Sequence, residues 1–216
     1  MMALLIAANP AMSTPPDQVT VPATAPENGG VMGIQYSHTS QYKKEFHAAI
    51  TAARKFCADY KAKHPTEKNL CVVSDIDETV LDNRPHVQRV GDDKDWGKFE
   101  EWLKKSEAPE LKSSADFLRW ARKNGFAVFF VTGRPEPQRA PTIINLVRRQ
   151  IPYDGMYCRE HNKNQEPAEV YKVRMRTKIE DMGFKIVENI GDQFSDLAGG
   201  HSLDCQKLPN KMSFIP

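Results

Sequence analysis

Several features that mark other protein classes are missing from this chain of 216 residues. No run of about 18 apolar residues occurs, the length that a membrane-spanning helix needs. The four cysteines form no CxxC pair, so we do not expect a cysteine-ligated zinc site. The net charge is only +2 and no long basic run occurs, which gives no reason to expect a nucleic-acid polymer as partner. The length is sufficient for one α/β domain with a substantial core.

The first 35 residues differ in composition from the rest of the chain. The start, MMALLIAANPAMS, contains a short apolar run, Ala3 to Ala8, without a basic segment before it. Such a run suits either a weak or truncated signal peptide or a frayed terminus. Residues 10–30 are rich in Pro, Thr, Ala and Gly. We therefore assign residues 1–35 to a disordered segment or signal-peptide remnant, and residues 36–216 to one folded domain.

Strand and helix patterns alternate along the rest of the chain. The run FAVFFVT has the continuous apolar character of a strand that is buried on both faces of a parallel sheet. The predicted strands are Asn69–Asp75, Phe126–Thr132, a short one around Met156, and Phe184–Ile190. The predicted helices are Ser40–His64 capped by Thr39 or Ser40, a stretch from Trp96 to Trp102, Ser113–Gly125 with a serine cap and Gly125 as its end, Pro137–Gln150, and Glu166–Met182 followed by Gly183. This alternation predicts an α/β fold, a doubly wound parallel sheet with crossover helices.

Three of the predicted strands end in unusual polar segments, namely SDIDET, VTGRP and IGDQFSDL. In open α/β sheets, ligands bind beyond the carboxyl ends of the strands. We therefore expect the fold to bring these distant segments together.

Asp75 and Asp77 in the first segment point to the same side of an extended chain, because they are two positions apart. One carboxylate can attack phosphorus and form an aspartyl-phosphate. The other can protonate the leaving oxygen and then deprotonate water. Crowding raises the pKa of one member of the pair, which helps that member hold a proton at mildly acidic pH. A solvated Asp-rich turn is the alternative, but the apolar strand that leads directly into the motif favours a functional site.

Asp192 and Asp196 in the last segment are four residues apart and can reach one ion. Ligand sets made only of oxygen suit a hard cation such as Mg²⁺, which would offset the repulsion among the carboxylates. The alternative is that both residues cap a helix, although Gly191 suits a tight turn at a strand end. In the second segment, the hydroxyl of Thr132 and the backbone N–H groups near Gly133 can hold phosphate oxygens.

In this order, SDIDET, VTGR, Lys172 within VYKVRMR, and GDQFSD resemble the four motifs of the haloacid dehalogenase (HAD) superfamily of phosphohydrolases. The DxDET form, the extension LDN, the YKxxxR pattern and the terminal KLPNKMSFIP are similar to subclass IIIB acid phosphatases. This group includes bacterial class C acid phosphatases and plant vegetative storage proteins. The resemblance covers about Tyr42 to Pro216, and it implies a HAD-like sheet with a small lid at about residues 84–111.

The resemblance also implies individual roles. Asp75 is expected to be the nucleophile and Asp77 the general acid/base. Mg²⁺ is expected on the Asp75 carboxylate, the Asp77 backbone carbonyl and Asp192, with Asp196 as a further ligand or a support. The remaining residues with an expected role are Thr132, Gly133 and Lys172, which hold the phosphoryl group, and Arg176, which pairs with an acidic group of the site.

Aromatic residues in the expected lid could stack a nucleobase. The helical spacing of Trp96, Phe99 and Trp102 instead favours packing of the lid against the sheet. We apply that interpretation to all but Trp102, because Trp102 matches a tryptophan that flanks the site in bacterial relatives. His86 is the second candidate for a substrate contact, although an exposed loop histidine is its simpler interpretation.

Together these features predict a Mg²⁺-dependent acid phosphatase that hydrolyses small phosphate monoesters, nucleotides among them, through an aspartyl-phosphate. Transfer of the phosphoryl group to an alcohol, and a non-catalytic storage or binding role, stay open as alternatives. Some plant storage relatives lack the nucleophilic aspartate, whereas this chain has Asp75. The resemblance favours a periplasmic or secreted protein. The sequence leaves open the oligomeric state, a homodimer included, and any disulfide among Cys57, Cys71, Cys158 and Cys205.

Overall fold

The computed structural model describes residues 15–24, 30–91, 95–160 and 166–215. Within them, five parallel strands form one sheet in the order β3-β2-β1-β4-β5. The strands are β1 Leu70–Ser74, β2 Ala127–Pro135, β3 Gly155–Arg159, β4 Lys185–Gly191 and β5 Asp204–Lys207. The predicted α/β class and doubly wound parallel sheet are confirmed.

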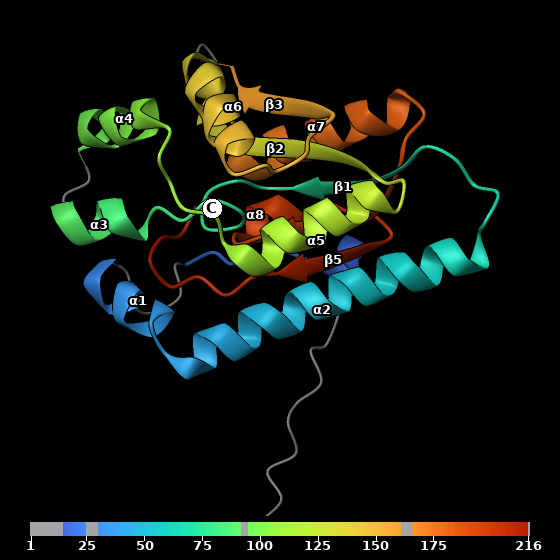
Figure 1. Ribbon diagram of the computed structural model, residues 1–216, viewed down its shortest axis with the longest axis horizontal. Helices are drawn as coiled ribbons and strands as arrows, with labels where there is room; N and C mark the ends of the chain where they lie inside the picture. Colours follow the sequence, from blue (N-terminus) through green and yellow to red (C-terminus); the bar gives the residue numbers. More distant parts are fainter. Residues whose placement is uncertain (1–14, 25–29, 92–94, 161–165, 216) are drawn as a thin grey trace, which may run out of the picture.

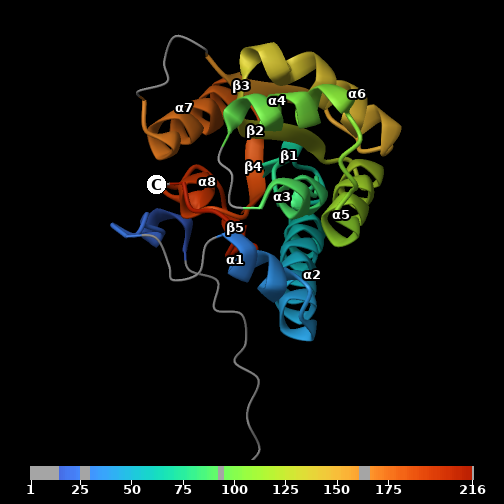
Figure 2. The same ribbon diagram turned by 90° about the vertical axis from the view of Figure 1, so that its left-hand side faces the viewer.

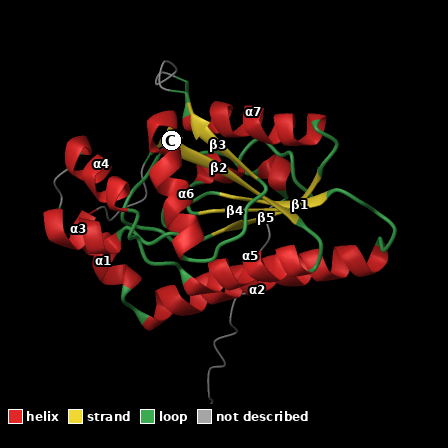
Figure 3. Cartoon of the chain, turned by 45° about the horizontal axis from the view of Figure 1, so that its top comes forward, coloured by secondary structure: helices red, strands yellow, loops and turns green. Residues whose placement is uncertain are grey.

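Helices cover both faces of this sheet (Figures 1 and 3). They are α1 Gly30–Ser37, α2 Ser40–Lys63, α3 Arg84–Val90, α4 Trp96–Lys105, α5 Lys112–Lys123, α6 Arg139–Arg148, α7 Ala168–Asp181 and α8 Phe194–Leu197, with 3-10 turns at Pro16–Gln18 and Glu136–Gln138. Val72 and Phe130 belong to the core shared with α2, α5 and α6, whereas Val73 and Phe129 pack with α7 on the opposite face. Alternate residues of each central strand thus enter different cores, which explains why these strands are apolar throughout.

The strand order reverses next to β1, and this reversal fixes where the site forms. From β1 the chain proceeds outward to β2 and β3, then returns to the other side of β1 as β4. Neighbouring strands β1 and β4 are therefore followed by connections that run in different directions, which opens a crevice at their carboxyl ends. Asp75 follows β1 and Asp192 follows β4, so the topology alone brings these carboxylates together.

The insertion between β1 and β2, predicted as a lid at residues 84–111, carries α3 and α4. Both helices lie on the side of the sheet to which the strands point, and Figure 2 places them in front of the strand ends. Backbone bridging between Leu81 and Glu110 closes the base of the insertion. Residues 92–94 lie outside the described residues.

The element boundaries follow the sequence patterns with a few differences. Thr39 caps α2 by accepting from the backbone N–H of Tyr42 at 3.1 Å, and Gly125 ends α5 with φ at 82°. The serine cap predicted for α5 is wrong, because the helix starts at Lys112 and no side chain caps it. Helices α1 and α3 and strand β5 were not predicted, and a helix at the position of α8 was raised only in the alternative that Asp192 and Asp196 cap one. All four are short, and a short element shows too few repeats for its periodicity to be recognised.

Part of the N-terminal segment expected to be disordered differs from that expectation. Helix α1 begins at Gly30, and Ile34 is buried. Gly33 lies so close to the C-terminal segment that a Cβ there would overlap the backbone of Lys211. This contact partner is distant in sequence, so composition could not reveal it. The apolar run Ala3–Ala8 lies outside the described residues.

Two negative findings concern the described residues only. No helix in the described ranges combines the length and the apolar character required to span a bilayer. The four cysteines, all of them within these ranges, are buried thiols that no disulfide joins.

Glu188, in the interior of β4, is a fully buried carboxyl next to Asp204 of β5. Burial, and then the neighbouring Asp204 carboxylate, raise the pKa of Glu188 well above its usual value of 4.5. The folded protein therefore keeps a proton on Glu188 at pH values where the unfolded chain has lost it.

We expect this retained proton to make the protein less stable as the pH rises above about 4.5. Between the unfolded and folded pKa values, each pH unit costs about 1.4 kcal/mol of unfolding free energy. Glu188→Gln cannot titrate, so its unfolding free energy should fall less steeply between pH 5 and pH 8 and exceed that of the wild type at pH 8. Urea unfolding at several pH values measures this. Exposed Glu107→Gln should retain the wild-type slope, and identical slopes for wild type and Glu188→Gln would contradict the assignment.

Candidate active site

Asp75 lies directly beyond β1 and is almost fully buried, with 6% of its surface exposed. Its Oδ1 accepts a hydrogen bond from Nζ of Lys172 at 2.8 Å, and its backbone N–H donates to the carbonyl of Ile190 on β4. Main chain and side chain are therefore both fixed, and the carboxylate is held at the crevice between β1 and β4.

Asp77 is held by a different basic residue, Arg134 at the end of β2. The guanidinium donates from Nε to both carboxylate oxygens, at 3.1 and 3.0 Å, and from Nη2 to Oδ1 at 2.6 Å. The amide of Asn83 donates to Oδ1 at 2.7 Å. The Arg134 guanidinium fixes the orientation of the Asp77 carboxylate, because this planar group donates to it from two nitrogens.

The two carboxylates have opposite pKa shifts. Burial raises the pKa of Asp75 well above its usual value; Lys172 acts to lower it, and the neighbouring Asp196, Asp192 and Asp77 act to raise it. Burial also acts to raise the pKa of Asp77, but the charge and hydrogen bonds of Arg134, together with Asn83, hold it below its usual value. The member with the raised pKa is therefore Asp75, whereas Arg134 stabilises the ionised form of Asp77 in the ligand-free protein.

Asp192, beyond β4, accepts three side-chain hydrogen bonds: from Thr79 at 3.1 Å, from Asn210 at 2.6 Å, and from Gln193. Burial, and then the charge of Asp196, raise its pKa to about 6 despite these donors. A Cβ on Gly191 would overlap the Asp196 carboxylate. Gly191 is therefore required by this close approach, a different reason from the turn geometry predicted from sequence.

The carboxylates fit a hard cation. Oxygen atoms of Asp75, Asp192 and Asp196, all buried, lie within 4.8 Å of one another. Lys172 is the basic residue that pairs with this group, through Asp75 and Asp196. The excess negative charge and the all-oxygen donor set are what Mg²⁺ requires. The Asp77 carboxylate is not part of this group, in keeping with the expectation that only its backbone carbonyl approaches the ion.

Two of the three predicted phosphate-binding residues line the cavity above these carboxylates, which has a volume of about 660 Å³. They are Gly133 and Lys172. Thr132 is fully buried, and its hydroxyl accepts from the backbone N–H of Arg134 at 3.2 Å. Thr132 therefore does not line the cavity, and its hydroxyl instead supports the irregular end of β2, where Gly133 stands.

The predicted pairing of Arg176 with an acidic group is wrong. Its guanidinium, 1% exposed, donates to the backbone carbonyls of Asp196 at 2.6 Å, of Gly200 at 3.0 Å, and of Ala198. Arg176 thus ties α7, which carries Lys172, to the segment that carries Asp196. Backbone carbonyls after a short helix lack partners of their own, and a buried arginine can satisfy several of them at once.

In the insertion, the residues expected to contact substrate, Trp102 and His86, do not line the cavity, whereas Trp96 and Phe99 do. Trp102 and His86 are both buried and stack on each other, with ring centroids 6.0 Å apart, and neither lines the cavity. Trp102 instead donates from its indole nitrogen to Oδ1 of Asn83 at 2.8 Å, so it supports Asp77 through Asn83. Trp96, which is 52% exposed, and Phe99 line the cavity.

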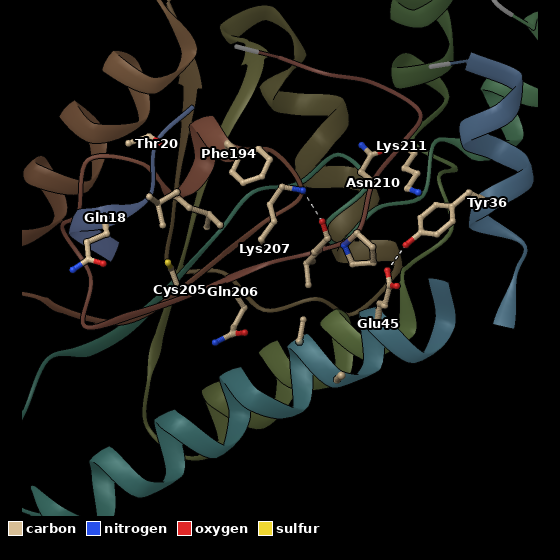
Figure 4. A pocket seen from close by; sticks show the side chains of 16 residues that line it. Gln18, Thr20, Tyr36, Glu45, Phe194, Cys205, Gln206, Lys207, Asn210 and Lys211 are labelled. Atoms are coloured by element: carbon tan, nitrogen blue, oxygen red, sulfur yellow. Dashed lines mark hydrogen bonds between the residues drawn. The ribbon is translucent and has the colours of Figure 1, made fainter. Parts of the chain in front are cut away.

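A second cavity, of about 720 Å³, lies between α2 and the free edge of β5 (Figure 4). Its labelled side chains include Tyr36, Glu45, Lys207 and Lys211, and none of the carboxylates described above lines it. Lys207 nevertheless acts to lower the pKa of Asp192, so its charge is felt at the site.

Sequence reasoning missed the residues that orient the carboxylates. Arg134 stands within the segment VTGRP, for which the expected roles concern only Thr132 and Gly133. Asn83 is the last residue of the extension LDN. Asn210 stands within KLPNKMSFIP, which served only to support the resemblance. Each of these residues stands within a segment that carries the family resemblance, which is the signal that could have identified it.

Comparison with known proteins agrees with this geometry. The sequence model of the family described as "HAD superfamily, subfamily IIIB (Acid phosphatase)" matches residues 8–216. Acid phosphatase 1 of Solanum lycopersicum is 36% identical over 151 residues, which cover 66% of this chain and 58% of that protein. The stem 28 kDa glycoprotein of Glycine max is 30% identical over 199 residues, covering 89% of this chain and 77% of that protein. Vegetative storage protein 1 of Arabidopsis thaliana is 25% identical over 148 residues, or 67% of this chain and 55% of that protein.

Among solved structures, the class C acid phosphatase from Bacillus anthracis superposes with a TM-score of 0.68 at 24% identity. The match covers 85% of this chain and 84% of that one. At this level of identity the likeness establishes a shared fold. The chain spans only about 58% of the length of the Solanum lycopersicum phosphatase, so that protein's activity does not transfer directly.

The close approach of Asp75, Asp192 and Asp196 predicts how stability depends on Mg²⁺. In metal-free solution Asp192→Asn should unfold at a higher temperature than the wild type, because it removes one buried like charge. Millimolar Mg²⁺ should raise the unfolding temperature of the wild type by several degrees through mass action, and leave that of the variant nearly unchanged. Thermal unfolding with and without Mg²⁺ measures both effects. Asp116→Asn, a substitution on the exposed face of α5, should respond to Mg²⁺ as the wild type does, and an equal Mg²⁺ response in Asp192→Asn would refute the metal assignment.

Proposed function

Because the chain belongs to subfamily IIIB of the HAD superfamily, the acid phosphatases, we propose that it hydrolyses small phosphate monoesters through an aspartyl-phosphate on Asp75, with Mg²⁺ as its cofactor. The observation that supports this most strongly is the separate fixing of two adjacent carboxylates over one cavity. Asp75 is held by Lys172 and Asp77 by Arg134. Each carboxylate therefore has its own orientation, as a nucleophile and a separate proton carrier require.

In the proposed reaction, an oxygen of Asp75 attacks phosphorus while the bond from phosphorus to the ester oxygen breaks. Asp77 gives a proton to the departing alcohol oxygen. It then takes a proton from the water that attacks the aspartyl-phosphate, which releases inorganic phosphate and restores Asp75. Lys172 and the backbone N–H groups near Gly133 hold the phosphoryl oxygens through both steps. Mg²⁺ held by Asp75, Asp192 and Asp196 would supply positive charge that offsets the repulsion between the carboxylates and the phosphoryl group.

Asp77 must acquire a proton before the first step, and the arrival of substrate supplies a physical reason for it to do so. A phosphoryl group bound next to Asp77 adds negative charge and raises the pKa of that carboxyl. The phosphoryl group also competes with Asp77 for the guanidinium of Arg134. Both effects favour a neutral Asp77 in the complex.

The cavity also suggests the kind of alcohol that leaves. Its lining combines the aromatic side chains of Trp96 and Phe99 with the apolar side chains of Met212 and Ile215. Such a surface accepts aromatic or partly apolar leaving groups, and the base of a nucleotide is one of these.

A storage role is the second candidate, because vegetative storage and stem glycoproteins are among the relatives described above. The feature that distinguishes the two candidates is the fixed set of Asp75, Asp77, Lys172 and Asp192. A storage protein has no need to keep buried carboxylates in mutual repulsion, since that arrangement costs stability.

Hydrolysis of p-nitrophenyl phosphate near pH 5.5 tests the proposal directly. We expect wild-type turnover with Mg²⁺, little with EDTA, and a loss of about a thousandfold or more in Asp75→Asn, because the nucleophile is gone. Asp116→Asn is the control variant. Measuring p-nitrophenol and inorganic phosphate separately, with an added alcohol, also reports transfer to alcohols as an excess of p-nitrophenol. A folded, Mg²⁺-loaded wild type without turnover would shift the conclusion to the storage role.

The role of Asp77 predicts a dependence on the leaving group. Asp77→Asn should lose about 10²- to 10⁴-fold in kcat with an alkyl phosphate, whose leaving oxygen needs a proton. With p-nitrophenyl phosphate, whose leaving group departs as an anion, the loss should be clearly smaller. Rates for a series of aryl and alkyl phosphates measure this trend. Equal losses across the series would show that Asp77 does not protonate the leaving oxygen.

A further inference from the structure

Three basic side chains line the cavity within the described part of the chain, and two of them are already engaged. They are Arg134, Arg159 and Lys172. Arg134 forms an ion pair with Asp77, and Lys172 forms ion pairs with Asp75 and Asp196. Arg159, the last residue of β3, forms no ion pair or hydrogen bond with any residue in the described ranges. Its Nε is buried and has no hydrogen-bond partner among the residues that the structure describes.

The two acidic residues that next follow Arg159 in sequence, Glu160 and Glu166, face another arginine. Arg174 on α7 donates to Glu166 at 2.9 Å and lies 3.7 Å from Glu160. The chain therefore provides carboxylates near Arg159 but places a different guanidinium against them. A buried donor without a partner is destabilising, and a guanidinium that lines a cavity can gain that partner from a bound anion.

The position of Arg159 separates it from the phosphoryl site. Strand β3 is two strands away from β1 in the sheet, or about 10 Å at the usual spacing of neighbouring strands. The register pairs Arg159 with Pro135, whereas Ser74, directly before Asp75, pairs with Phe130. Arg159 therefore lies beyond the level of Asp75, toward the part of the cavity that the leaving alcohol would occupy.

We propose that Arg159 binds a second anionic group, carried by the leaving alcohol of the substrate. The preferred substrates are then phosphate monoesters whose alcohol bears a carboxylate or a further phosphate at some distance from the scissile bond. This proposal rests on the phosphatase function proposed above, because it assigns the second end of the same substrate. A planar guanidinium with free donors recognises either kind of anion through paired hydrogen bonds.

Binding of unreactive phosphonates tests the proposal without any turnover. ω-Phosphonoalkanoates with two to six methylene groups are compared by calorimetry, in Mg²⁺, with alkylphosphonates of the same length that end in a methyl group. A parallel series of α,ω-bisphosphonates reports whether a phosphate-like end is preferred over a carboxylate. We expect wild type to bind at least one acid-ended compound about tenfold more tightly than its methyl-ended counterpart.

Arg159→Gln should abolish this preference and leave the affinity for the methyl-ended compounds within about twofold of wild type. Arg122→Gln is the matched control, because Arg122 pairs with Asp154 before β3, at the opposite end of the strands. It should keep the wild-type preference. The proposal is overturned if the wild type binds no phosphonate, or if it binds acid-ended and methyl-ended phosphonates equally at every chain length. It is also overturned if Arg159→Gln still binds the acid-ended compounds more tightly.

Turnover separates this proposal from the function on which it rests. The kcat/KM of Arg159→Gln should fall about tenfold for the acid-bearing ester of the preferred length and stay near wild type for p-nitrophenyl phosphate. An equal fall for both esters would place Arg159 on the transferred phosphoryl group and overturn the proposal. If the wild type hydrolyses p-nitrophenyl phosphate but does not prefer acid-ended phosphonates, only the role of Arg159 is refuted. If the wild type is inactive but still prefers acid-ended phosphonates, only the phosphatase function is refuted.

Discussion

The buried carboxylates of Asp75, Asp192 and Asp196 lie within 4.8 Å of one another, and their mutual repulsion is the constraint to which the surrounding structure responds. Lys172 offsets part of this charge by pairing with two of the three. Uncharged donors from Thr79, Asn210 and Gln193 solvate Asp192. The charge that remains is what the proposed Mg²⁺ would offset.

Holding like charges together requires a rigid frame, and the sheet supplies it. The backbone of Asp75 is bonded to β4, and Gly191 lets the chain approach Asp196 closely. Arg176 extends this frame by joining α7 to the three carbonyls around and after α8. The buried guanidinium of Arg176 is therefore satisfied by backbone carbonyls, and it forms no ion pair with a carboxylate among the described residues.

Support and recognition come from different parts of the insertion. Trp102, stacked on His86, reaches the site only through Asn83, which in turn holds Asp77. Trp96 and Phe99 face the cavity. The first part of the insertion, His86 with Trp102, thus supports the orientation of Asp77, and the second part, Trp96 with Phe99, lines the cavity. Changes in the second part could alter substrate choice without disturbing the first.

The sequence by itself determined the class of fold, the family and the carboxylates of the site, because these depend on local signals. An apolar run that ends in SDIDET or IGDQFSDL marks both a buried strand and the polar group beyond it, whatever the rest of the chain does. Only the tertiary structure decided which partner each charged group has. Arg134 holds Asp77, Arg176 holds carbonyls, and Arg159 is left for a ligand, although all three are arginines next to motifs or strand ends. Helical spacing likewise showed that Trp96, Phe99 and Trp102 share a helix, but which of them faces the cavity depends on the angle at which that helix packs. Such pairings are set by distances between segments far apart in sequence, and no local pattern encodes those distances.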